Sequence, residues 1–226
     1  MIEGFRIRTQ WQRAAKQDIE RARGIAVSNI SDVMSRQSGA PASIRPFHSG
    51  GPLSGPALTV RCRPGDNLML HKALQMVQPG DVIVVDAEGA LDNAIMGELM
   101  LARAVQAKAA GVVIYGAIRD TSEIAAQDVP VFAAGVSHRG PYKDGPGEIG
   151  YAISLGSMVI QPGDLIVGDA DGVLAIPRAT ASTVLDRAEK KHTAEMKQLQ
   201  QTLKGEYDGT WIDASLAAGG CHISDH

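Results

Sequence analysis

Three charged residues, Glu98, Arg119 and Asp120, stand at the two ends of an apolar segment, G-E-L-M-L-A-R-A-V-Q-A-K-A-A-G-V-V-I-Y-G-A-I-R-D. The segment predicts a helix from about Gly97 to Ala110, followed by a strand over Val112 to Tyr115. Ligands of open α/β sheets bind beyond the carboxyl ends of strands, where Arg119 and Asp120 would lie. Glu98 would lie at the start of the helix, where free backbone N–H groups can hold a carboxylate.

These residue types could together bind a metal-bound keto acid. Asp120 would ligate a hard cation such as Mg²⁺, Glu98 would reach its water shell, and Arg119 would bind an anionic oxygen. Each residue also has a structural interpretation. Glu98 would then complement the helix dipole, and Arg119 would pair with Asp120 or another surface acid. Spacing alone favours this structural interpretation.

Other catalytic motifs are absent from the sequence. There is no G-x-S-x-G, no P-loop and no G-x-G-x-x-G after a strand, which argues against a serine hydrolase, an NTPase and a dinucleotide enzyme. None of the six histidines stands in an H-E-x-x-H motif. No predicted strand contains a lysine, so Schiff-base aldolase chemistry is not expected.

The amino-acid composition indicates which kinds of partner and which fold class to expect. The net charge is −3 with both signs interspersed, so we expect a small-molecule ligand or another copy of the chain, and neither nucleic acid nor a membrane surface. The two cysteines and the absence of an apolar N-terminal segment predict a cytoplasmic protein. No apolar run is long enough to span a membrane. Aromatic residues make up only 4% of the chain, and a core of small aliphatic residues favours an α/β fold.

The remaining elements follow from periodicity and turn residues. A helix is expected at 11–24, then a short one ending at Met34 and capped by Ser28 or Ser31. A further helix is expected at 68–77, and a polar helix is expected at 179–205, followed by a tail. Strands are expected at 57–63, 129–136, 151–155, 158–160 and 173–177. Two similar stretches, 79–89 and 162–172, each begin with a Pro-Gly-Asp turn and continue as a strand. Their similarity indicates either a repeated sheet or turns of the same type, and shared turn chemistry is the more common cause of such a similarity. Two glycine- and proline-rich loops, 38–56 and 137–149, are expected to shape a pocket.

The acid at 98, the twenty residues that follow it and the Arg-Asp pair resemble the signature of the RraA-like / HMG aldolase family. The stretches V-S-N-I-S-D-V-M, G-P-A-L-T-V-R-C, P-G-D-N-L-M-L-H-K-A-L, G-P-G-E-I-G and P-G-D-L-I-V-G-D-A-D-G-V extend the resemblance over roughly residues 20 to 205. It implies one RraA-like domain over residues 1–226, with an N-terminal helical segment 1–36 and a C-terminal helix and tail 179–226. The implied fold is a compact β/β/α fold like the swivelling phosphohistidine domain, assembled into homotrimers or homohexamers with active sites between subunits.

The resemblance also implies an activity. Enzymes of the family are class II, metal-dependent aldolases that cleave 4-hydroxy-4-methyl-2-oxoglutarate or 4-carboxy-4-hydroxy-2-oxoadipate to pyruvate and a second keto acid. Many of them also decarboxylate oxaloacetate, because both reactions pass through a pyruvate enolate. The alternative is a non-catalytic regulator that binds and inhibits a ribonuclease.

Residue roles carry over from the family position by position. Asp120 would ligate Mg²⁺ or Mn²⁺, Glu98 would hold a metal-bound water, and Arg119 would stabilise the enolate oxygen. Backbone N–H groups of Leu99 and Met100 would hold the pyruvyl carboxylate.

Two glutamates need separate comment. In the family an acid from the neighbouring subunit's C-terminal helix approaches the site, and Glu195 is the best match, with Glu189 second. Glu98 is a departure, because the characterised aldolases typically carry Asp at this position. Its extra methylene could move the water it holds or change the metal preference.

Overall fold

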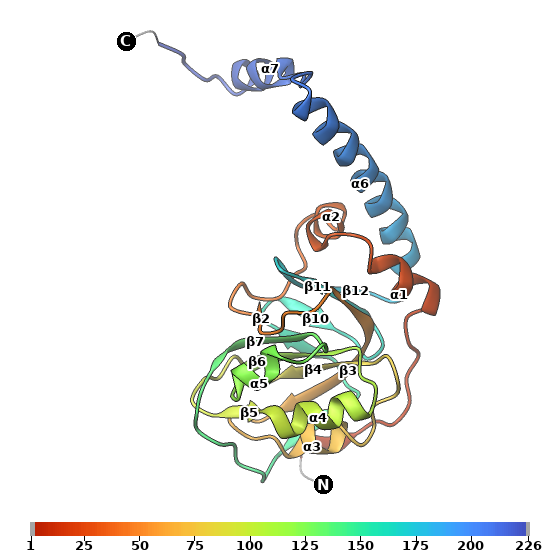
Figure 1. The fold of residues 1–226 in the computed structure, drawn as a ribbon, viewed down its shortest axis with the longest axis vertical. Coiled ribbons are helices and arrows are strands. Elements are labelled where there is room, and N and C mark those ends of the chain that lie inside the picture. Colours follow the sequence, from red (N-terminus) through yellow and green to blue (C-terminus); the bar gives the residue numbers. More distant parts are fainter. Residues whose placement is uncertain (1–2, 225–226) are drawn as a thin grey trace.

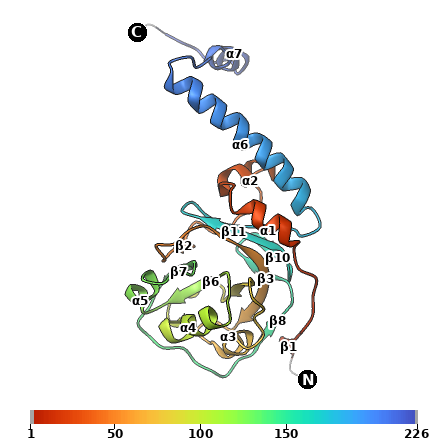
Figure 2. The ribbon, with the colours of Figure 1, turned by 45° about the vertical axis from the view of Figure 1, so that its right-hand side comes forward.

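The computed structural model describes residues 3–224. It contains a 10-stranded sheet, a separate two-stranded sheet and helices on the outside (Figures 1 and 2). The mixed α/β class expected from the sequence is confirmed. The large sheet comprises β1 (Phe5–Ile7), β2 (Arg45–Pro46), β3 (Leu53–Cys62), β4 (Val82–Asp86), β5 (Ala94–Met96), β6 (Gly111–Ile118), β7 (Val131–Val136), β8 (Gly147–Ile149), β11 (Leu165–Asp169) and β12 (Gly172–Ile176).

The other elements surround this sheet. The two-stranded sheet is an antiparallel hairpin of β9 (Ile153–Leu155) and β10 (Met158–Ile160). The helices are α1 (Lys16–Ala22), α2 (Val27–Val33), α3 (Leu68–Ala73), α4 (Glu98–Gln106), α5 (Thr121–Ala125), α6 (Ala181–Leu203) and α7 (Thr210–Ala218). Figures 1 and 2 show α6 extending away from the sheet, with α7 beyond its far end. None of the helices in residues 3–224 is long and apolar enough to cross a membrane.

The centre of the sheet is parallel, in the order β3-β4-β6-β7. β4 is buried along its whole length, as expected for a parallel strand covered on both faces. Because side chains alternate along a strand, Ile83 and Val85 pack with α3 and α4 on one face. Val82 and Val84 pack with the β9–β10 hairpin on the other face. The sheet therefore has two different covered faces, one helical and one made of strands.

The N-terminal part departs from the predicted helices. The helix expected at 11–24 begins only at Lys16, because the segment before it pairs with the Pro-Gly-Asp turn of the unit 162–172: the backbone N–H of Ala14 donates to Gly163 O at 2.8 Å. Neither Ser28 nor Ser31 caps α2, so that prediction was wrong. Instead, the N–H of Val27 donates to Asp169 Oδ2 at 2.9 Å.

The C-terminal part confirms the long polar helix as α6, but the expected tail contains a further helix, α7. α6 packs through Ala181, Val184, Leu185 and Ala188 against the N-terminal helices and β11–β12, which forms a third core. α7 has no buried residue.

The two Pro-Gly-Asp units form the same turn in different sheet contexts. Asp81 Oδ2 accepts from the N–H of Gln78, and Asp164 Oδ2 accepts from the N–H of Gln161, each at 2.9 Å. The strand after the first turn is parallel to β3, whereas the strand after the second is antiparallel to it. The similarity therefore comes from turn chemistry rather than from a repeated sheet.

Candidate active site

The start of α4 and the end of β6 meet through strand β5. β5 pairs with β6, with Met96 opposite Ile118, and the N–H of Arg119 donates to Met96 O at 3.0 Å. β5 ends at Met96 and α4 begins at Glu98. The two charged ends of the apolar segment, far apart in sequence, are therefore adjacent in space, as predicted.

Asp120 has an unusual backbone conformation and a side chain that crosses to α4. Its φ of 57° is in the left-handed region, which costs a non-glycine residue on the order of 1 kcal/mol. Asp120 stands at the N-cap of α5 but its side chain does not cap that helix. Instead, Oδ2 accepts a hydrogen bond from the N–H of Glu98 at 3.0 Å. Oδ1 makes no hydrogen bond within residues 3–224, which leaves one carboxylate oxygen for a ligand.

Arg119 is also available to a ligand. Its side chain is 43% exposed, and its only ion pair among the described residues joins Nε to Asp120 Oδ2 at 3.7 Å. That distance is too long for a hydrogen bond. Most of the guanidinium donors therefore remain free to bind an anion.

Gly97 is the residue that lets these groups approach. A Cβ at this position would lie 2.3 Å from Asp120 Oδ2 and 3.1 Å from Arg119 Cγ. Its φ of −145° is open to other residues, so the requirement is for space rather than for a special backbone conformation. Any larger residue would force the carboxylate of Asp120 away from the start of α4.

A pocket of about 180 Å³ opens beside these residues. Arg119, Asp120, Leu99 and Met100, all predicted from the sequence, line it. The remaining lining residues are Asn67, His71, Ala94, Ile95, Met96, Gly97, Pro141 and Lys143. Pro141 and Lys143 belong to the loop 137–149, as expected, whereas the loop 38–56 contributes no lining residue.

Asn67, His71 and Lys143 are the polar lining residues that the sequence analysis missed. Asn67 is 2% exposed, and its Nδ2 donates to Ile95 O at 2.9 Å. Its Oδ1 is buried without a hydrogen-bond partner in the described chain, which is costly unless a ligand supplies a donor. Asn67 and His71 lie within P-G-D-N-L-M-L-H-K-A-L, a stretch that indicated the family, but no spacing rule identifies either as a site residue.

His71 is held as a neutral donor. Burial lowers its pKa, and the positive charges of Arg103 and Lys143 lower the pKa further. Nη1 of Arg103 lies 3.0 Å from Nδ1 of His71. Because a guanidinium can only donate, Nδ1 must accept, and the proton resides on Nε2.

The first turn of α4 offers one free backbone donor. The N–H of Glu98 is bound to Asp120, and the N–H of Met100 donates to Gly97 O at 3.1 Å. The N–H of Leu99 has no acceptor within the part of the chain that the structure describes. Binding of a carboxylate by Leu99 and Met100 stays a prediction, and the geometry favours Leu99. The Glu98 side chain is exposed and does not line the pocket.

The predicted glutamates of α6 lie elsewhere in the same chain. Glu195 accepts from Asn29 Nδ2 and from Lys191 Nζ, and these contacts lower its pKa. Glu189 binds Arg21, with Oε1 accepting from Nε at 2.9 Å. α6 leaves the sheet away from α3 and α4 (Figure 1), so within one chain neither glutamate joins the pocket. Their predicted approach to a neighbouring subunit's pocket stays a prediction.

The donor set fits a metal ion that keeps most of its water. No group of three or more His, Cys, Asp or Glu side chains gathers in residues 3–224. The pocket thus offers a cation one carboxylate oxygen, that of Asp120. This suits Mg²⁺, which gives up its waters reluctantly and commonly binds proteins through one or two carboxylates, with waters and substrate oxygens as the other ligands. A closed zinc or calcium cage does not fit this pocket.

Comparison with known proteins identifies the family. The profile of the RraA-like family, described as Aldolase/RraA, matches residues 27–175, which include every residue that lines the pocket. The chain belongs to the RraA-like family. The resemblance inferred from the acid at 98 and the Arg-Asp pair is thereby confirmed.

Individual relatives are named both as aldolases and as inhibitors. A protein of Halalkalibacterium halodurans named "Putative 4-hydroxy-4-methyl-2-oxoglutarate aldolase" is 42% identical over 173 residues, which cover 76% of this chain and 82% of the relative. The solved RNA-processing inhibitor RraA from Thermus thermophilis is 29% identical with a TM-score of 0.61, over 67% of this chain and 92% of that chain. Streptomyces coelicolor RraAS2, described as an unusual member of the RNase ES inhibitor RraA protein family, has a TM-score of 0.75 at 24% identity, over 83% and 98% of the two chains. This last likeness concerns the fold alone.

Proposed function

We propose that the chain is a metal-dependent carbon–carbon lyase. Its substrate is a 4-hydroxy-2-oxo acid with two or three carboxyl groups, 4-hydroxy-4-methyl-2-oxoglutarate or 4-carboxy-4-hydroxy-2-oxoadipate, and its products are pyruvate and a second keto acid. The observation that carries this proposal is the convergence of the free Asp120 oxygen, the Arg119 guanidinium and the start of α4 on one pocket. The 42% identical relative named for this activity supports it.

The pocket residues suit the chemistry of this cleavage. Asp120 would hold Mg²⁺ or Mn²⁺, and that ion would supply a Lewis acid for the 2-oxo group. Arg119 donates hydrogen bonds to the same oxygen as negative charge develops there. The N–H of Leu99, with that of Met100 after a small adjustment, binds the pyruvyl carboxylate at the start of α4. Glu98, whose side chain is exposed outside the pocket lining, would turn toward the pocket to hold a water bound to that ion.

Further pocket residues recognise the rest of the substrate. Asn67 Oδ1, which has no donor among the described residues, accepts from a water bound beside the substrate, so the single proton of the 4-hydroxyl group remains for the base. The ammonium of Lys143 and the Nε2–H of His71 face a distal carboxylate. When the 4-hydroxyl group loses its proton, the C3–C4 bond breaks, and its electrons pass to the enolate of pyruvate. C4 becomes the carbonyl carbon of the second keto acid. The enolate then takes up a proton at C3 to give pyruvate. Oxaloacetate decarboxylation passes through the same enolate and is the expected side activity.

The assembly completes the site in this proposal. The chain acts as a single RraA-like domain, with the swivelling phosphohistidine-domain-like fold, in a homotrimer or homohexamer. Glu195 of a neighbouring copy reaches the pocket and accepts the proton of the 4-hydroxyl group, directly or through water. The position of α6 outside the sheet body supports this arrangement (Figure 2).

A coupled assay of pyruvate release tests the proposal. The two aldol substrates and oxaloacetate are each offered with Mg²⁺, with Mn²⁺ and with EDTA. We expect pyruvate from at least one aldol substrate, lost with EDTA and restored by excess Mg²⁺. If none of the three compounds gives metal-dependent release of pyruvate, the enzyme proposal is contradicted.

A ribonuclease regulator is the second candidate, supported by the 29% identical Thermus protein described as an inhibitor of RNA processing. Its test measures cleavage of a labelled RNA by an endoribonuclease from the same cells, with and without the purified chain. Stoichiometric inhibition that Asp120→Asn leaves unchanged would favour the regulator. Absence of inhibition, together with metal-dependent pyruvate release, would leave the lyase alone.

A further inference from the structure

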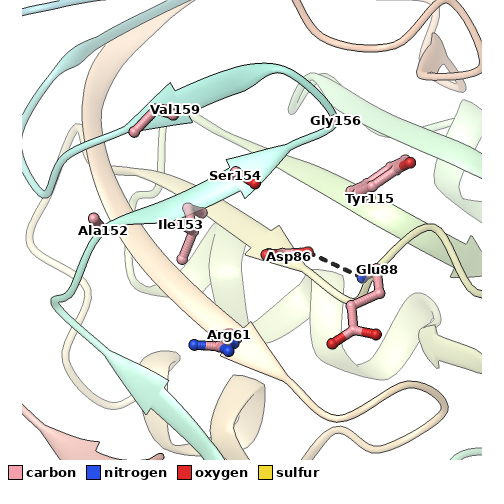
Figure 3. A pocket seen from close by; sticks show the side chains of 9 residues that line it. All are labelled: Arg61, Asp86, Glu88, Tyr115, Ala152, Ile153, Ser154, Gly156 and Val159. Atoms are coloured by element: carbon pink, nitrogen blue, oxygen red, sulfur yellow. Dashed lines mark hydrogen bonds between the residues drawn. The ribbon is translucent and has the colours of Figure 1, made fainter.

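A second pocket of about 520 Å³ lies on the opposite face of the sheet from the candidate active site. It lies between the β9–β10 hairpin and the carboxyl ends of β3, β4 and β6 (Figure 3). Its volume falls in the range of small-molecule sites in proteins. Nothing in the proposed lyase reaction uses it.

A row of three polar side chains forms the floor of this pocket. Arg61 on β3 pairs with Asp86 on β4, and Asp86 pairs with Tyr115 on β6. Residues in register on neighbouring strands project to the same face. Asp86 follows Val85, which packs on the helical face with α4, so the row faces the hairpin and not the Arg119–Asp120 pocket.

The acidic side of the pocket lacks a cation. Asp86 is 9% exposed, and its Oδ1 accepts from the N–H of Glu88 at 3.0 Å (Figure 3). Its Oδ2 has no partner within residues 3–224, and the Glu88 carboxylate makes no ion pair there. A carboxylate oxygen that is open to the pocket and has no cation can accept a charge-assisted hydrogen bond from the ammonium group of a ligand.

The basic side of the pocket carries a surplus positive charge. Arg61 donates through Nη1 to Glu148 Oε2 at 3.0 Å. The same carboxylate accepts from Nε of Arg6 at 2.6 Å. Two guanidinium groups thus share one carboxylate, and Arg61 lines the pocket on the strand next to that of Asp86 (Figure 3). A carboxylate of a ligand would find a fork of donors here.

The walls between the two charged sides are apolar. Ile153 on the sheet-facing side of the hairpin and the ring of Tyr115 line the space above the polar row, whereas Val159, 62% exposed on the other side of the hairpin, only borders the pocket (Figure 3). Such walls would contact an aliphatic side chain of a ligand. A bare divalent cation fits less well, since only Asp86 and Glu88 could ligate it and residues 3–224 hold no metal-binding group of three.

We propose that this pocket binds a free aliphatic α-amino acid such as L-leucine. Its ammonium group binds Asp86 Oδ2, its carboxylate binds Arg61, and its side chain lies against Ile153 and Tyr115. The opposed charges select a zwitterion over a simple amine or a simple acid. This assignment does not rest on the proposed lyase function.

Calorimetric titration with three matched probes tests it. L-leucine carries both charged groups, 3-methylbutylamine lacks the carboxylate, and 4-methylpentanoate lacks the ammonium. We expect saturable binding of L-leucine and at least 10-fold weaker binding of the other two. Saturating pyruvate with Mg²⁺ should leave the L-leucine affinity unchanged, because the two pockets lie on opposite faces.

Three variants locate the binding. Asp86→Asn keeps an oxygen for the N–H of Glu88 while removing the charge, and Arg61→Gln leaves Glu148 paired with Arg6; each should weaken L-leucine binding at least 10-fold. Glu20→Gln, a charge removal on exposed α1, should leave the affinity unchanged, and circular dichroism checks that all three fold. No saturable binding of L-leucine, equal binding of the three probes, or unchanged affinity in Asp86→Asn would each overturn the proposal.

Discussion

The backbone N–H of Glu98 donates a hydrogen bond to Oδ2 of Asp120 at 3.0 Å, across 22 positions of sequence. This bond holds the carboxylate against the positive end of the α4 dipole, where negative charge is stabilised. It also leaves Oδ1 without a hydrogen bond among the described residues. At position 98 the structure shows a role for the backbone, while the exposed side chain stays outside the pocket lining.

Replacing Gly97 with alanine should damage the site without unfolding the protein. The new Cβ would lie 2.3 Å from Asp120 Oδ2, so the carboxylate must move and its bond to Glu98 must break. We expect kcat/KM for pyruvate release to fall at least 10-fold. Gly51→Ala is the control, since nothing lies within 4 Å of its added Cβ. Equal kinetics in the two variants would show that the approach of Asp120 to α4 does not matter.

Removing the guanidinium of Arg119 should reduce turnover rather than binding alone. If Arg119 stabilises charge on the enolate oxygen, Arg119→Ala should lower kcat on the order of 10²-fold or more. Steady-state kinetics of pyruvate release would measure this, with Arg45→Ala as a control because Arg45 only binds backbone carbonyls at an edge strand. Normal kcat in Arg119→Ala would refute the assigned role.

Asp120 should control metal affinity. Asn retains an oxygen that can accept from the N–H of Glu98, and it tolerates the left-handed backbone of this position, so Asp120→Asn should fold. The lost charge should weaken Mn²⁺ binding at least 10-fold, measured by electron paramagnetic resonance of free Mn²⁺. Wild-type activity should vanish with EDTA and return with Mg²⁺. Undiminished Mn²⁺ affinity in the variant would assign the metal to other residues.

Mixed oligomers can show whether Glu195 acts in a neighbouring copy. Asp120→Asn and Glu195→Gln should each be nearly inactive alone. Refolded or co-expressed mixtures should regain part of the activity, because some pockets then combine an intact Asp120 with an intact Glu195 from another subunit. Light scattering would establish that the mixtures are oligomers. A stable monomer, or a mixture no more active than its parts, would remove Glu195 from the site.

His71 should make stability depend on pH. Its pKa is lowered in the folded chain from the ordinary value of 6.5. As the pH falls below that value, the unfolded chain binds the proton first, so the free energy of unfolding decreases until the lowered folded pKa is passed. Urea denaturation between about pH 7.5 and 5 should show this decrease in the wild type and a smaller one in His71→Gln. Parallel pH profiles for the two proteins would contradict it.

The sequence by itself determined the α/β class, and it predicted that Glu98, Arg119 and Asp120 come together. Glu98 is 22 positions from Asp120, but a single helix and strand connect the two residues, so one short unit of sequence places both at the same edge of the sheet. The long polar helix α6 was likewise visible as a local pattern.

Only the tertiary structure decided which other residues join these. Asn67, His71 and Lys143 come from segments distant in sequence, and no periodicity relates them. The pairing of Ala14 with Gly163 shortened the first predicted helix, since a long-range hydrogen bond outweighed local helix propensity. The requirement for glycine at 97 depends on the position of Asp120. The order of apolar and polar residues within one segment determines whether that segment forms a helix or a strand. Which distant segments contact each other depends on how all of them pack together, and no single segment carries that information.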